Sequence, residues 1–61
     1  MNYLTDIAFW TRKMENKEAK AVVVKNWDKV VEISTDDEKS KELLDLIIAG
    51  DKKGIEGSLH H

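Results

Sequence analysis

Residues 20–50, KAVVVKNWDKVVEISTDDEKSKELLDLIIAG, decide the fold. Two runs of β-branched residues flank Asn26–Lys29, whose Asn and Asp are typical of a turn. We therefore predict a two-stranded antiparallel hairpin over Ala21–Ser34. A four-residue loop would leave one face wholly apolar, and a three-residue loop fits almost as well, so the register stays open. In the first register, apolar residues occupy both faces: Val22, Val24, Val31 and Ile33 on one, and Ala21, Val23 and Val30 on the other.

A helix is predicted after the hairpin. Thr35 and Glu38 have the spacing of a capping box, and Gly50 is a suitable residue to end the helix. Its apolar residues are Leu43, Leu44, Leu46, Ile47 and Ile48. They span about 200° of a helical wheel, whereas a helix resting on one sheet needs a stripe of little more than ~100°. The additional width of the apolar arc predicts that this helix packs against a second surface as well as the sheet.

Residues 3–15 fit a helix better than a strand, because most of their apolar residues fall within an arc of about 160°. Trp10 lies in that arc and is expected in the core, whereas Phe9 lies outside it and is expected at the surface. The predicted fold is α+β, ordered helix, two-stranded antiparallel hairpin, helix. If residues 3–15 form a strand instead, the fold becomes a three-stranded antiparallel meander plus the C-terminal helix.

A chain of 61 residues forms one domain and has a thin margin of stability, which oligomerisation often increases. It contains no Cys, which excludes disulfides and fits a cytoplasmic protein. No apolar run approaches the length of a membrane span. Gly57–His61 is typical of a cloning linker and the start of an expression tag. We therefore expect the domain at residues 1–56 and a frayed tail from residue 51.

The sequence lacks the patterns of an enzyme. No Ser is spaced with a His as in a nucleophilic site, and there is no Walker-type glycine loop. The acidic cluster Asp36–Glu38 is explained by helix capping and has no calcium-loop spacing. We expect no catalytic residue, no metal site and no cofactor.

The favoured function is a small protein-interaction or regulatory module that acts as a homo-oligomer, with a dimer preferred, or binds an unknown protein partner. The candidate interface residues are Phe9, Val23, Val30, Leu44, Leu46 and Ile48. In size and composition the chain resembles the short accessory proteins of phages and mobile elements, although no motif carries that resemblance.

The alternative function is nucleic-acid binding at the hairpin. Lys20, Lys25 and Lys29 would place positive charge beside Trp27, which could stack on a base. The net charge of −2 and the neighbouring acids Asp28 and Glu32 oppose it.

Overall fold

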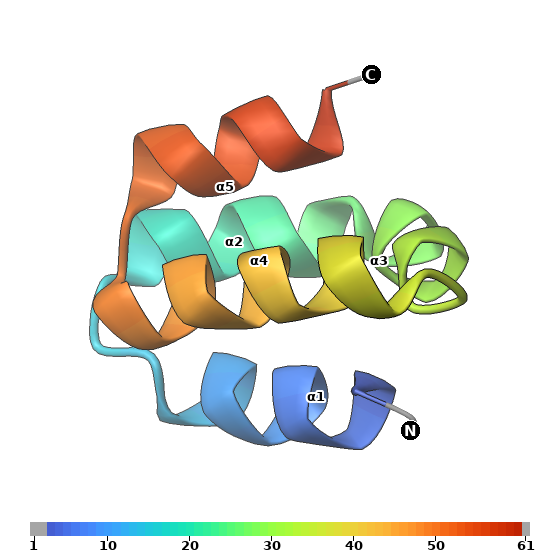
Figure 1. Ribbon diagram of the computed structural model, residues 1–61. Coiled ribbons are helices and arrows are strands. Elements are labelled where there is room, and N and C mark those ends of the chain that lie inside the picture. Colours follow the sequence, from blue (N-terminus) through green and yellow to red (C-terminus); the bar gives the residue numbers. More distant parts are fainter. Residues whose placement is uncertain (1–2, 61) are drawn as a thin grey trace.

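The computed structural model describes residues 3–60, which form five α-helices and no strand (Figure 1). The helices are α1 (Leu4–Lys13), α2 (Lys17–Lys25), α3 (Trp27–Ile33), α4 (Asp37–Ala49) and α5 (Lys52–Leu59). The predicted α+β class is therefore wrong, both as a helix–hairpin–helix and as a three-stranded meander with a helix. The helices expected over residues 3–15 and before Gly50 are present as α1 and α4.

Helices α2 and α3 replace the predicted hairpin. Asn16 starts α2, because its side-chain oxygen accepts hydrogen bonds from the backbone amides of Glu18 and Ala19 at 3.1 and 3.2 Å. The residues that follow, Lys-Glu-Ala-Lys-Ala, are good helix formers. At the junction with α3, the Asn26 side-chain amide donates to the Val22 carbonyl at 2.8 Å. The Asn and Asp that suggested a β-turn thus lie at a helix–helix junction.

The apolar residues of this segment follow a helical period. Ala19, Val23 and Val30 are fully buried. Ala19 and Val23, four residues apart, share one face of α2, and Val30 is the buried residue of α3. β-Branching lowers helix propensity by only about 0.5 kcal/mol per residue, which burial of a single Val exceeds. The runs of consecutive valines therefore resemble a strand in sequence, although tertiary packing makes this segment helical.

Helix α4 begins one residue later than predicted. Asp36 is the cap, and its carboxylate accepts a hydrogen bond from the Lys39 amide at 3.2 Å, whereas the Thr35 hydroxyl donates to the Glu32 carbonyl. The predicted end at Gly50 is confirmed. Gly50 has φ +68°, the left-handed conformation that favours glycine, and the Asp51 amide donates to the Leu46 carbonyl at 3.0 Å.

Helix α4 lies between α1 and α5 in Figure 1, and its apolar residues contact both. Helix α5 also packs against α2. The buried core residues are Ile7, Ala19, Val23, Val30, Leu43, Ile47, Ile55 and Leu59. The two buried hydroxyls are satisfied, because Thr11 donates to the Ile7 carbonyl and Ser40 donates to the Ile33 carbonyl.

None of the helices in residues 3–60 combines the length and apolar character that crossing a bilayer requires.

The expected frayed tail is instead helix α5. Asp51 caps it by accepting a hydrogen bond from the Gly54 amide at 3.0 Å, and Ile55 and Leu59 are buried in the core. Gly57, Ser58 and Leu59, which we assigned to a linker and tag, belong to this helix, and His61 lies outside the described residues. Their origin from cloning stays a prediction.

The two glycines inside α5 have different surroundings. A Cβ added at Gly54 would lie 2.5 Å from Leu46 Cδ2 and 2.7 Å from the Asp51 carboxylate, whereas one added at Gly57 would meet no atom within 4 Å. Close packing of α5 on α4 therefore explains Gly54 but not Gly57.

We predict opposite effects of alanine at these two positions. Gly57→Ala should raise the free energy of unfolding by about 0.5–1 kcal/mol, because alanine is the better helix former. Gly54→Ala should lower it by about 1 kcal/mol, because overpacking outweighs the same propensity gain. Urea unfolding followed by circular dichroism measures both. Equal stabilisation by the two substitutions would contradict the close contact between α5 and α4.

Candidate functional site

The outer face of α1 carries exposed aromatic residues. Ile7 and Thr11 are the buried residues of this helix. Phe9 lies on the opposite face and Trp10 at the rim of the buried face, and they have 50% and 38% of their surfaces exposed. Their ring centroids lie 5.6 Å apart with an interplanar angle of 86°, an edge-to-face pair. The Lys13 ammonium lies 4.9 Å from the centroid of the Phe9 ring, within cation–π range.

Ile48 of α4 extends this apolar area. It is 51% exposed and, together with Trp10, lines a shallow hollow of about 390 Å³ between the carboxyl-terminal ends of α1 and α4. The other lining residues are Lys13, Met14, Glu15, Asn16, Ile47, Ala49 and Gly50. We call Phe9, Trp10 and Ile48 the aromatic surface.

The structure separates the six predicted interface residues. Val23 and Val30 are fully buried in the core of a single chain, and Leu44 and Leu46 are half-buried against that core. Only Phe9 and Ile48 are exposed. Two of the six predicted interface residues therefore belong to the aromatic surface.

Trp10, which connects these two, was expected in the core and is instead partly exposed. The signal that could have found it is its position at the rim of the apolar arc of residues 3–15. A bulky side chain at such a rim reaches beyond the neighbouring helix.

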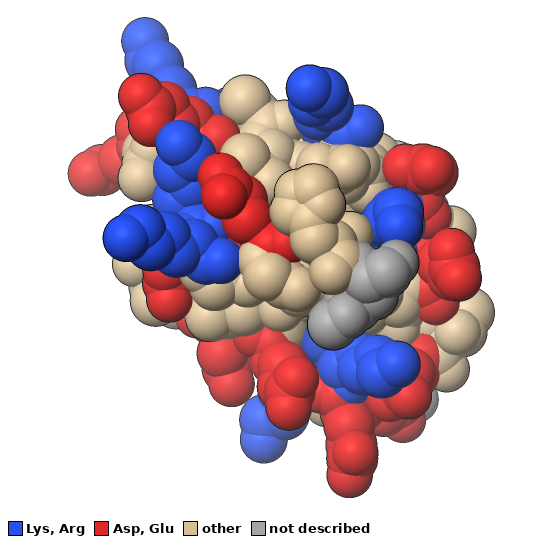
Figure 2. Space-filling view, turned by 90° about the horizontal axis from the view of Figure 1, so that it is seen from above, with Lys and Arg blue, Asp and Glu red and all other residues tan. Residues whose placement is uncertain are grey.

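The residues of the nucleic-acid alternative do not form a hairpin tip. Lys20 donates to the Arg12 carbonyl at 3.5 Å, and Lys25 is exposed at the end of α2. Trp27 is half-buried and packs against the core at the start of α3. Lys29 is half-buried and lines a separate hollow. On the face above α5, lysines and acidic residues are intermixed rather than segregated (Figure 2).

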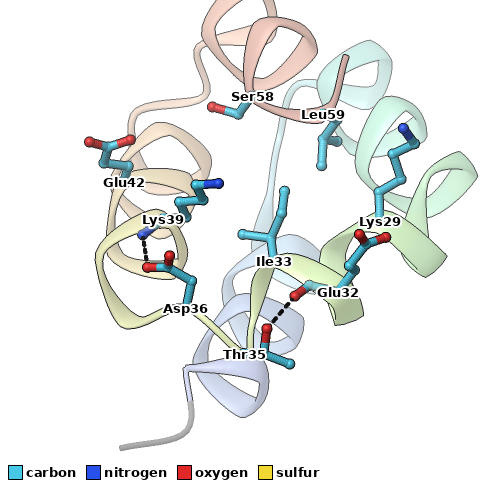
Figure 3. Close-up of a pocket in the computed structure, with 9 residues that line it drawn as sticks. All are labelled: Lys29, Glu32, Ile33, Thr35, Asp36, Lys39, Glu42, Ser58 and Leu59. Atoms are coloured by element: carbon cyan, nitrogen blue, oxygen red, sulfur yellow. Dashed lines mark hydrogen bonds between the residues drawn. The ribbon is translucent and has the colours of Figure 1, made fainter. Parts of the chain in front are cut away.

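The hollow beside Lys29 has a volume of about 380 Å³ and lies among α3, α4 and α5 (Figure 3). Its lining residues are Lys29, Glu32, Ile33, Thr35, Asp36, Lys39, Glu42, Ser58 and Leu59. Small-molecule pockets are mostly apolar with few polar groups, whereas most of these side chains are charged or polar. The hollow is therefore a polar depression without the lining of a ligand pocket.

One ion pair joins distant parts of the chain. The Lys52 ammonium lies 3.1 Å from the Glu18 carboxylate and 3.9 Å from that of Glu56. The hydrogen bond to Glu18, with the attraction of its charge, raises the pKa of Lys52. This ion pair links α5 to α2 and is solvent-exposed, so its contribution is structural and small.

Within residues 3–60 no group of three His, Asp or Glu side chains is arranged to hold a metal ion.

Comparison of the chain with protein-family models, with curated proteins and with solved structures finds no match. The aromatic surface is therefore the feature of this chain that indicates a function.

The neighbouring residues Ile47 and Ile48 test whether this surface is dispensable for folding. Ile47→Ala should lower the free energy of unfolding by about 2–4 kcal/mol, because Ile47 is 2% exposed. Ile48→Ala should change it by less than about 0.5 kcal/mol, since Ile48 is half-exposed and alanine favours the helix. Thermal and urea unfolding at low protein concentration measure both. A large loss of stability in Ile48→Ala would show that Ile48 serves the core.

Proposed function

We propose that this chain is a non-enzymatic protein-interaction module that acts as a homo-oligomer, and that the aromatic surface is its contact. The observation that carries the proposal is the exposure of Phe9, Trp10 and Ile48 at neighbouring positions on α1 and α4. Aromatic residues are enriched at protein interfaces and provide much of the binding energy there.

The position of this surface suits an interface. Helix α1 lies at one edge of the molecule, so no other helix of residues 3–60 covers its outer side (Figure 1). The remaining large exposed hydrophobic residues, Val24 and Val31, lie on α2 and α3. They are aliphatic and smaller, and exposed residues of this kind are common on monomers.

The exposed area favours a weak dimer. With about 200 Å² for each aromatic side chain, the exposed fractions of Phe9 and Trp10 correspond to about 180 Å². A standard stable interface buries ~800 Å² per partner, so the aromatic surface can form only the centre of a small interface. We accordingly expect a dissociation constant on the order of 100 µM.

The nucleic-acid alternative has less support. Trp27, the aromatic residue it would use, packs against the core, and Lys29 lies in a hollow that also contains Glu32 and Asp36. No basic face therefore accompanies an exposed aromatic ring on α2 or α3.

For the location of the protein we propose the cytoplasm, because the sequence contains no Cys.

Sedimentation equilibrium between about 10 µM and about 1 mM tests the proposal. The unmodified chain should show a monomer–dimer equilibrium. Phe9→Ser should weaken it at least ~10-fold, because it removes a central aromatic contact. Val24→Ser, which changes an equally exposed residue on α2, is the matched control and should have no effect.

Two results would contradict the proposal. A chain that stays monomeric over the whole concentration range does not self-associate. Association that Val24→Ser weakens and Phe9→Ser leaves intact would place the interface on α2 instead of at the aromatic surface.

A further inference from the structure

The exposed face of α1 carries charges of opposite sign at its two ends. Asp6, Phe9, Trp10 and Lys13 are spaced i, i+3, i+4 and i+7, so they lie on one face of the helix. All four are exposed. Read along α1, this face carries an acid, two aromatic rings and a base. We call these four residues the α1 stripe.

The α1 stripe is complementary to itself when reversed. Asp6 and Lys13 lie at equal distances along the chain from the midpoint between Phe9 and Trp10. A two-fold axis through that midpoint and perpendicular to α1 would bring Asp6 of one copy opposite Lys13 of the other, twice. A two-fold interface requires this kind of self-complementarity, because the same patch meets itself.

The charges of the α1 stripe have no partner of opposite charge within one chain. Among residues 3–60 no ion pair or side-chain hydrogen bond engages Asp6 or Lys13, and the Lys13 ammonium lies over the Phe9 ring. Both charges also suit the dipole of α1, since Asp6 is in its first turn and Lys13 in its last. The dipole does not explain why they share one face with the two exposed rings.

We infer that the partner of the aromatic surface is the α1 helix of a second copy, packed antiparallel about an axis between Phe9 and Trp10. This inference rests on the proposed self-association and specifies its orientation. Asp6 then pairs with the partner's Lys13, while the aromatic rings of both copies form the centre. A parallel arrangement is disfavoured, because it would bring Asp6 opposite the partner's Asp6 and Lys13 opposite the partner's Lys13.

Charge reversal tests the orientation. Asp6→Lys and Lys13→Asp should each weaken dimerisation about 10-fold at low salt, because each converts two attractive pairs into two repulsive ones. The double variant, Asp6→Lys with Lys13→Asp, should recover the original dissociation constant to within about 3-fold, since both pairs are restored with their signs exchanged. Sedimentation equilibrium of the full chain measures all four proteins.

Two matched controls separate the interface from helix stability. Lys25→Asp reverses a last-turn base in α2. Asp28→Lys reverses a first-turn acid in α3. Neither should change dimerisation. Circular dichroism checks that each variant is folded. If a charge-reversed variant unfolds, the neutral variants Asp6→Asn and Lys13→Gln replace it. Each should weaken dimerisation about 3-fold.

The outcomes distinguish this inference from the proposed function. If the unmodified chain dimerises and the single reversals leave the dissociation constant unchanged, the antiparallel orientation is wrong while self-association stands. If the single reversals weaken the dimer and the double variant does not recover, the pairing of Asp6 with Lys13 is wrong. If the unmodified chain stays monomeric at about 1 mM, both the proposed function and this inference fail.

Discussion

Helix α4 holds the molecule together, because both of its flanks are buried against other helices. Leu43 and Ile47 are buried, and Leu44 and Leu46 beside them are half-buried against the core, so this helix contacts α1 on one side and α5 on the other. The helices have only 7 to 13 residues, and isolated helices shorter than ~12–15 residues are marginal in water. Packing around α4, rather than intrinsic propensity, therefore holds them together.

The structure gives another explanation for the wide apolar arc of α4. From the sequence, the arc indicated an apolar surface that a second molecule would bury. In the structure, α5 covers much of it, because residues expected to form a tail bury Ile55 and Leu59 in the core. Val23 and Val30, expected on the outer face of a hairpin, fill the same core. Among residues 3–60, the large apolar side chains that remain exposed are those of Phe9 and Trp10 on α1, Ile48 on α4, Val24 on α2 and Val31 on α3.

Local signals were enough to predict part of the fold. Gly50 ended α4 as expected, because a left-handed residue is one of the clearest helix terminators. The hairpin failed because consecutive valines satisfy a two-residue period as well as a helical one, and β-branching favoured the strand. The buried pair Ala19 and Val23 shows the helical period of α2 only when residues before Ala21 are included. Helix α5 was missed because Gly54 and Gly57 lower its propensity, and packing on α4 compensates.

The candidate site was predictable to the same limited extent. Phe9 was found because it falls outside the apolar arc of α1, and Ile48 because it lies at the rim of the arc of α4. Trp10 lies at a rim as well, and a helical wheel cannot say how far a neighbouring helix covers a rim residue. The shared face of Asp6 and Lys13 follows from the helix predicted over residues 3–15, but the position of α1 at the edge of the molecule does not follow from the sequence.

NMR secondary chemical shifts measure whether residues 17–33 form two helices that contribute to one core. We expect Cα shifts displaced to the helical side through Val22–Val24 and Val30–Ile33, with an interruption at Asn26. Cα shifts displaced to the strand side through both valine runs would contradict this expectation.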